Sequence, residues 1–320
     1  MMLFKNFKTM RTKAFFIIVI LISTLGFSQQ DPQYTQYMYN TQIINPAYAG
    51  SRGMLSFGLL GRSQWVNING APNTVSFTVN SPMGKTENMG LGLSVVHDQI
   101  GPVTDSNVNV DYAYTIYPSY HSKLSFGLKA GLDILNIDYT KLNLFDAMDP
   151  RFQTNVDNKL QPQIGAGIMY ATDNLYLGLS VPNFLTTRHY DDNNLITGGS
   201  DSVAAERVHY YFIGGYVFNL SSNLKFKPAT MIKAVSGAPL QIDASANFMF
   251  NDKFTLGAAY RWDSAISGLV GFQVSDNIFI GAAYDYQTSD LKDYSNGSYE
   301  LIFRFDVLSK QAKAISPRFF

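Results

Sequence analysis

A repeated alternation of apolar and polar side chains constrains this chain more than any other feature. From Met54 onward, short polar turns separate segments in which every second side chain is apolar. In residues 277–287, for example, Ile, Ile, Ala, Tyr and Tyr share one face, and Phe, Gly, Ala, Asp and Gln share the other. A period of two is typical of a β-strand whose two faces meet different surroundings. The sequence therefore predicts an all-β protein.

Three properties favour a transmembrane barrel over a soluble β-sandwich, which also alternates. The segments are about ten to twelve residues long, the length of tilted membrane strands rather than of ordinary ones. Their polar faces carry Gly, Ala, Ser and Thr more often than Lys and Glu, and charged residues make up only 15% of the chain. Aromatic residues gather near segment ends, as in the interfacial girdles of barrels: Tyr112, Tyr114, Tyr260, Trp262, Tyr284 and Tyr286.

The number and spacing of the segments predict an antiparallel up-and-down barrel of about fourteen strands. An even number places both ends of the barrel in the periplasm, where connections are short. The two longest gaps, 138–160 and 183–204, then fall on the outer face as long extracellular loops. The expected strands are 54–63, 73–82, 88–97, 105–118, 122–137, 161–171, 174–182, 205–218, 222–235, 239–250, 253–263, 265–275, 277–289 and 296–308.

The first 28 residues resemble a secretory signal peptide. Basic residues precede an unbroken apolar run from Ala14 to Ile22, which is too short to span a membrane as a helix. Small residues flank Phe27, and cleavage is expected before Gln29. We therefore expect a signal peptide at 1–28, an N-terminal periplasmic or plug segment at 29–53, the outer-membrane barrel at 54–308 and a periplasmic tail at 309–320.

Charged residues of both signs fall on the predicted luminal face of the strands. Because buried charges must pair or stay hydrated, we interpret them as a paired network that stiffens a narrow interior. The alternative is a selectivity lining for small solutes, which would make the chain a porin-like channel. The residues of this predicted network are Lys129, Asp133, Asp243, Arg261, Asp285, Glu300 and Arg304.

Sequence motifs for catalysis, metals or nucleic acid are missing. The chain has no cysteine, its four histidines are scattered, and none has the spacing of metal ligands. Lys and Arg balance Asp and Glu at 24 each, so there is no basic surface for nucleic acid. We predict no enzymatic activity, no cofactor and no metal site. A Ser–His or Asp–His pair at the outer rim would favour a hydrolase instead.

The two long outer loops are the better candidates for contact surfaces. They combine aromatic side chains with acids and amides, which is typical of surfaces that bind partner proteins. The alternative is that the loops fold over the barrel mouth and bury their own apolar groups. The candidate contact residues are Tyr139, Phe145 and Phe152 in the first loop, and Phe184 and Tyr190 in the second.

The two ends of the mature chain carry a family resemblance. The segments Gln36–Asn40, Asn45–Ser51 and Ser316–Phe320, with the barrel pattern between them, resemble the PorP/SprF family of Bacteroidota. The most specific part is the run Asn45, Pro46, Ala47, Tyr48, Ala49 and Gly50. That family is associated with type IX secretion and gliding motility.

The resemblance implies a non-enzymatic role at the outer membrane. Expected partners are membrane lipid, other components of the type IX secretion system, or a C-terminally tagged secreted adhesin held at the cell surface. For the N-terminal run we favour a turn that caps or partly plugs the lumen, with Gly50 supplying a positive φ. The alternative is a docking motif for a partner protein. The closing residues Arg318, Phe319 and Phe320 offer cationic and aromatic groups for docking.

Overall fold

The computed structural model describes residues 32–84, 87–142, 154–185 and 207–307. In this part of the chain a single antiparallel sheet contains fifteen strand segments. Val217 separates β8 from β9, and both pair with β10, so the two form one strand of the barrel. The strands are β1 (Leu55–Ser63), β2 (Asn73–Met83), β3 (Met89–Ile100), β4 (Val103–Ser119), β5 (Ser122–Ile137), β6 (Val156–Thr172), β7 (Leu175–Val181), β8 (His209–Tyr216), β9 (Phe218–Ser221), β10 (Leu224–Val235), β11 (Gln241–Phe250), β12 (Phe254–Arg261), β13 (Ala265–Ser275), β14 (Ile278–Gln287) and β15 (Ser298–Val307).

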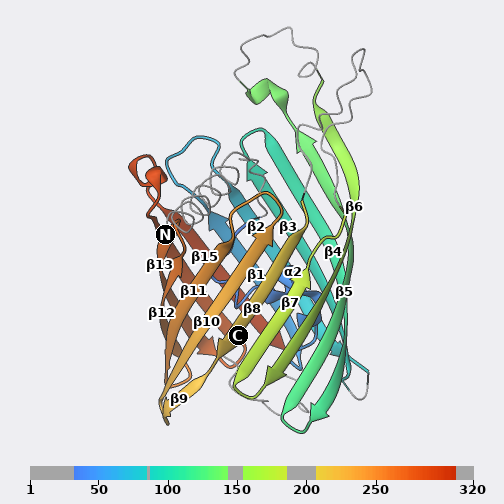
Figure 1. Ribbon diagram of the computed structural model, residues 1–320, viewed down its shortest axis with the longest axis vertical. Coiled ribbons are helices and arrows are strands. Elements are labelled where there is room, and N and C mark those ends of the chain that lie inside the picture. Colours follow the sequence, from blue (N-terminus) through green and yellow to red (C-terminus); the bar gives the residue numbers. More distant parts are fainter. Residues whose placement is uncertain (1–31, 85–86, 143–153, 186–206, 308–320) are drawn as a thin grey trace, which may run out of the picture.

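The sheet closes on itself as a barrel (Figure 1). Each strand pairs with its sequence neighbours, and β15 pairs with β1 from Leu55 opposite Val307 to Ser63 opposite Tyr299. The pairing of β10 with β11 completes the ring. Fourteen barrel strands in the described residues confirm the predicted fold class and strand number.

The two faces of the strands separate as the alternation predicts. In β15, exposed Leu301 and Phe303 alternate with buried Glu300, Ile302 and Arg304. The exposed residues form an apolar outer surface, as a wall facing lipid requires. Among the described residues, no helix is both long and apolar enough to cross a membrane.

The connections differ at the two ends of the barrel. We call one the long-loop end because it carries connections 64–72, 138–155, 182–208 and 288–297. We call the other the short-turn end because it carries connections 120–121, 173–174, 222–223, 251–253 and 276–277.

Strands β4, β5 and β6 are the longest, with 17, 16 and 17 residues (Figure 1). Strand β6 extends past β7 at the long-loop end, and β4 extends past β3 at the short-turn end. We expected β6 to start at 161, but it starts at Val156, where Val156 pairs with Ile137. The alternation there is obscured by the polar run 157–159, and cross-strand pairing overrides it.

Among the described residues, short helical turns occur in the N-terminal segment and in two loops. The α-helix α2 (Thr41–Ile44) and the 3₁₀ turn η1 (Pro46–Tyr48) lie inside the barrel. The 3₁₀ turns η2 (Tyr139–Lys141) and η4 (Asp290–Asp293) belong to connections at the long-loop end. The hydrophobic core is therefore enclosed by the strands and is built partly on the N-terminal segment.

Candidate functional site

The N-terminal segment occupies the interior of the barrel. We call residues 33–52 the plug. Most of its side chains are buried, with Met38 and Gln36 at 1% exposure and Ala47 and Asn45 at 0%. The main buried cluster contains plug residues Tyr34, Tyr37, Met38, Ile44, Ala47 and Tyr48 together with strand residues such as Leu60, Met169, Tyr176, Ile213, Met231, Leu269, Phe279 and Ile302.

The plug runs through the barrel from one end to the other. At the long-loop end, the side-chain amide of Gln33 donates to Gln241, the first residue of β11, at 2.6 Å. At the short-turn end, Arg52 bonds Asp306, the penultimate residue of β15. The plug, coloured blue in Figure 1, therefore spans the bore with its N-terminal part at the long-loop end.

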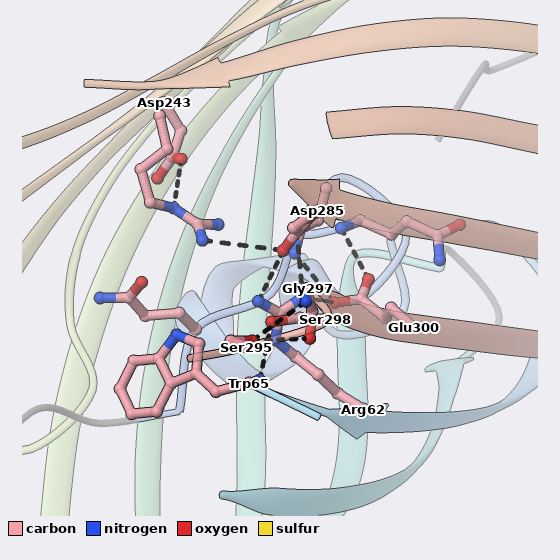
Figure 2. Close-up of polar contacts among 12 residues, drawn as sticks. Arg62, Trp65, Asp243, Asp285, Ser295, Gly297, Ser298 and Glu300 are labelled. Carbon is pink, nitrogen blue, oxygen red and sulfur yellow. Dashed lines mark hydrogen bonds and ion pairs between the residues drawn. The ribbon is translucent and has the colours of Figure 1, made fainter. Parts of the chain in front are cut away.

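A cluster of charges holds the first part of the plug. Nη2 of Arg62 lies 2.7 Å from Asp285, and its Nη1 lies 3.0 Å from Glu300. Arg261 bonds Asp243 at 2.7 Å and lies 3.9 Å from Asp285. Figure 2 shows Arg62, Asp285 and Glu300 converging, with Asp243 to one side. We call these five residues the charge cluster. With two cations and three anions, it leaves one carboxylate in excess.

Donors from the plug bond the carboxylates of this cluster. The amide of Thr35 donates to one oxygen of Glu300 at 2.9 Å, and the amide of Gln36 donates to the other at 2.7 Å. The hydroxyl of Thr35 donates to Asp285 at 2.8 Å. Buried carboxylates need such hydrogen bonds to offset the loss of water. The plug therefore supplies the hydrogen-bond donors that the carboxylates of the charge cluster need.

The middle of the plug is held by a second polar group. The side-chain amide of Gln42 donates to Asp111 at 3.0 Å, and its oxygen accepts from Asn80 at 3.0 Å. Lys129 donates to the carbonyl of Ile43 at 2.7 Å and lies 3.8 Å from Asp111. The plug thus receives bonds from strands on several sides, which fixes its rotation as well as its depth.

The N-terminal family motif forms the turn that packs against the strands. Asn45 accepts from the amide of Ala47 and donates to the carbonyl of Ile168, so it caps η1 and ties it to β6. Gly50 has φ +70°, the positive value expected for it. Tyr48 belongs to the buried cluster. Each motif residue therefore has a packing or capping role inside the barrel.

Glycines on the inner wall make room for this turn. A Cβ at Gly127 would overlap the backbone of Pro46 and Ala47, and one at Gly167 would overlap the side chain of Asn45. Close approach of one backbone to another requires residues without a side chain. The glycines of the luminal face therefore leave the space that the plug fills.

The last part of the plug is fixed near the short-turn end. Arg52 bonds both oxygens of Asp306, at 2.7 and 3.2 Å, and the hydroxyl of Ser56 donates to the same carboxylate at 2.6 Å. Arg304 lies 3.3 Å from Asp306, and its guanidinium stands 4.8 Å from the ring of Phe279. The bidentate Arg52–Asp306 pair is a strong anchor because both side chains are largely shielded from water.

The structure places all seven predicted luminal charges in the interior. Lys129, Asp243, Arg261, Asp285, Glu300 and Arg304 take part in the contacts above, and Asp133 is 2% exposed in β5. Sequence reasoning missed Arg62 and Arg52. Arg62 is two residues from Leu60 in its predicted strand and so lies on the same inner face, which the alternation would have predicted. Arg52 lies before the barrel pattern begins, so no periodic signal marks it.

The predicted contact residues of the outer loops are separated from the plug. Tyr139 is 4% exposed and packs with Leu135 and Ile137 at the base of its loop. Its neighbour Asp138 accepts from the hydroxyl of Thr140, and this bond holds the pKa of that carboxyl below its usual range. Phe184 is 47% exposed. Phe145, Phe152, Tyr190, Arg318, Phe319 and Phe320 lie outside the described residues, as do the expected signal peptide and C-terminal tail.

A Ser–His contact occurs at the long-loop end. Nδ1 of His97 lies 2.8 Å from the hydroxyl of Ser106, its cross-strand neighbour, at an exposed position. In the described part of the chain no carboxylate bonds His97, so the pair lacks the third group that orients a catalytic histidine. No group of potential metal ligands is found in that part either.

The chain was compared with solved structures, curated sequences and family models. Omp33 of Acinetobacter baumannii has 10% sequence identity and a TM-score of 0.46, over 80% of this chain and 100% of that one. The CymD monoaromatic hydrocarbon channel has 11% identity and a TM-score of 0.49, over 88% and 94%. The search of curated protein sequences found no match. The family described as type IX secretion system membrane protein PorP/SprF matches residues 26–305, most of the chain. The protein is thus located in the outer membrane and belongs to the PorP/SprF family of type IX secretion system membrane proteins.

Proposed function

We propose that this chain is a non-enzymatic binding component of the type IX secretion system, which contacts other parts of the machinery or holds a secreted adhesin at the cell surface. Membership of the family supports the link to secretion. The second role would also connect the protein with gliding motility. In both, the barrel serves as a rigid support in the membrane.

The observation that carries this proposal is the filled lumen. A porin needs an open aqueous path through the barrel, whereas here the plug lies in the bore. The inner charges, which could have lined a path for solutes, instead bond one another and the plug through Thr35, Gln36, Gln42 and Arg52. This arrangement favours a binding role over a channel.

The contact surfaces of the proposed role lie outside the lumen. Phe184 is the exposed aromatic residue of the second outer loop within the described residues. Tyr139 packs inward and would support its loop rather than touch a partner. The other candidates are Phe145, Phe152 and Tyr190 in the outer loops, and Arg318, Phe319 and Phe320 at the C-terminus.

Affinity purification of the tagged protein from native outer membranes, followed by mass spectrometry, tests the proposal. We expect co-purification of type IX secretion proteins or of one secreted protein with a C-terminal secretion signal. A Phe184→Ser variant should recover less of an outer partner than a matched Tyr294→Ser variant, whose ring is 72% exposed in the β14–β15 connection. Recovery of neither class from membranes that contain the folded barrel would contradict the proposal.

A further inference from the structure

A hollow in the barrel wall lies across strands β4 to β8, which are neighbours in the sheet (Figure 1). We call it the wall groove. Its volume is about 680 Å³, within the roughly 300–1,000 Å³ of ligand sites, and its lining is almost entirely apolar. Its larger lining side chains are exposed: Tyr112, Phe126, Leu128, Ile168, Leu179 and Tyr210. The wall groove therefore opens on the lipid-facing surface rather than into the bore.

A small side chain forms the floor of the wall groove. Ala166 on β6 lies opposite Leu128 on β5 and Val181 on β7. Leu128 in turn lies opposite Tyr112 on β4. Side chains at directly paired positions point to the same face of a sheet. Because Ala166 extends less far from the wall than these neighbours, the surface dips at this position.

The plug supports the wall behind the groove. The side-chain amide of Asn45 donates to the carbonyls of Ile168 and Leu179, at 3.2 and 3.4 Å, and the side chains of both residues line the groove. Gly127 and Gly167 also line it, and the plug packs directly against their inner side. The groove is therefore preformed, as ligand sites usually are.

The depth of the groove places it within the hydrocarbon of the membrane. Ala166 and Ile168 lie six and four residues before Thr172, where β6 ends at the short-turn end. At about 3.4 Å per residue and a tilt of about 40°, they stand about 10–16 Å above that end. The apolar band of such barrels is about 25 Å tall, and their short turns face the periplasm. The groove thus reaches from the periplasmic half of the band to its middle.

We infer that the wall groove binds one acyl chain of a phospholipid from the periplasmic leaflet of the outer membrane. The groove is continuous with the lipid-facing wall, so hydrocarbon is the medium around it. An unfilled hollow would leave the lining atoms without contacts. A thin, flexible acyl chain follows a local dip, whereas the wall of a second barrel is convex and stiff. The apolar lining leaves the polar head of the lipid outside, at the periplasmic surface.

Native mass spectrometry of the purified protein in mild detergent tests the inference. Palmitoyl-oleoyl phosphatidylethanolamine is added in equimolar amount, and we expect one lipid bound to the wild type. Ala166→Trp should lose it, because the indole occupies the floor of the groove. The matched control Gly268→Trp carries the same side chain at an exposed position of β13 and should keep the lipid. Absence of bound lipid from the wild type, or equal retention by Ala166→Trp, would overturn the inference.

A second measurement locates the lipid and covers a failed variant. Phosphatidylethanolamine with a photoreactive group in the middle of one chain should label peptides that contain Ile168 or Leu179 more strongly than the peptide that contains Val270, which is exposed on β13. If Ala166→Trp gives no heat-modifiable barrel, the smaller change Ala166→Leu should still reduce this labelling. Even labelling around the wall would contradict the inference, as would cross-linking of the groove to a second copy of the chain.

Discussion

At the scale of single residues, the interior depends on Arg62. It is 3% exposed and pairs with both Asp285 and Glu300, while Arg261 reaches only one of them at 3.9 Å. Removing one partner of a buried ion pair costs more than the pair itself contributes, because the other charge stays buried without compensation.

Substitution Arg62→Met should therefore destabilise the barrel strongly. We expect a loss of about 3–5 kcal/mol in the free energy of unfolding, measured by urea titration of the purified protein in detergent. The double variant Arg62→Met with Glu300→Gln should recover part of this loss, because one buried charge is removed as well. Equal stability of Arg62→Met and the wild type would show that water reaches the charge cluster.

Glycine positions on the two faces of the wall should respond differently to a larger side chain. At Gly167 a new Cβ would overlap Asn45, whereas at Gly268 it would meet nothing within 4 Å. We expect Gly167→Val to cost about 1–3 kcal/mol, as overpacked interiors do. Gly268→Val serves as the control and should change stability by less than about 0.5 kcal/mol, as exposed sites do. Similar losses in both variants, compared by urea titration, would indicate an effect on strand propensity alone.

Sequence reasoning identified residues well where a strand period fixed their face. The alternation of each strand predicted that Asp243, Asp285 and Glu300 face the interior, and Gly50 was expected to have a positive φ. It did not identify the partners of these charges. Thr35 and Gln36 bind Glu300 through backbone amides, and a backbone group leaves no signal in the sequence.

At the scale of elements, the strands were predictable and the plug was not. Most predicted strand bounds lie within a few residues of the observed ones, because period-two alternation and polar turns mark each strand. The plug has only one helical turn, α2, and one 3₁₀ turn, so it carries no period. Its direction depends on contacts with strands distant in sequence, which a single sequence does not reveal.

The C-terminal tail should act separately from the barrel. Strand β15 pairs with β1 and β14 up to Val307 and Phe305, so sheet closure requires nothing beyond 308. We predict that deletion of 311–320 leaves a heat-modifiable barrel on unheated gels but reduces the recovery of partners in affinity purification. Loss of the heat-modifiable form after deletion would instead identify the tail as the signal for assembly.

At the scale of the whole molecule, the barrel and the plug fold together as one unit. Its outer wall faces lipid, and its interior is filled by the plug. The wall meets lipid with exposed side chains such as Leu128, Leu179 and Leu301. The interior is occupied by the plug, the charge cluster and the Arg52–Asp306 pair. Contact with other proteins is therefore left to surfaces outside the lumen, which agrees with a binding role in secretion.

Planar-bilayer recording of the purified full-length protein tests most directly the claim that the plug closes the barrel. We predict no stable conductance steps from the full-length protein. A variant lacking residues 34–49 should give steps if gel mobility shows that it has folded, since the bore is then empty. A stable open channel formed by the full-length protein, with the conductance of the plug-deleted variant, would contradict the account.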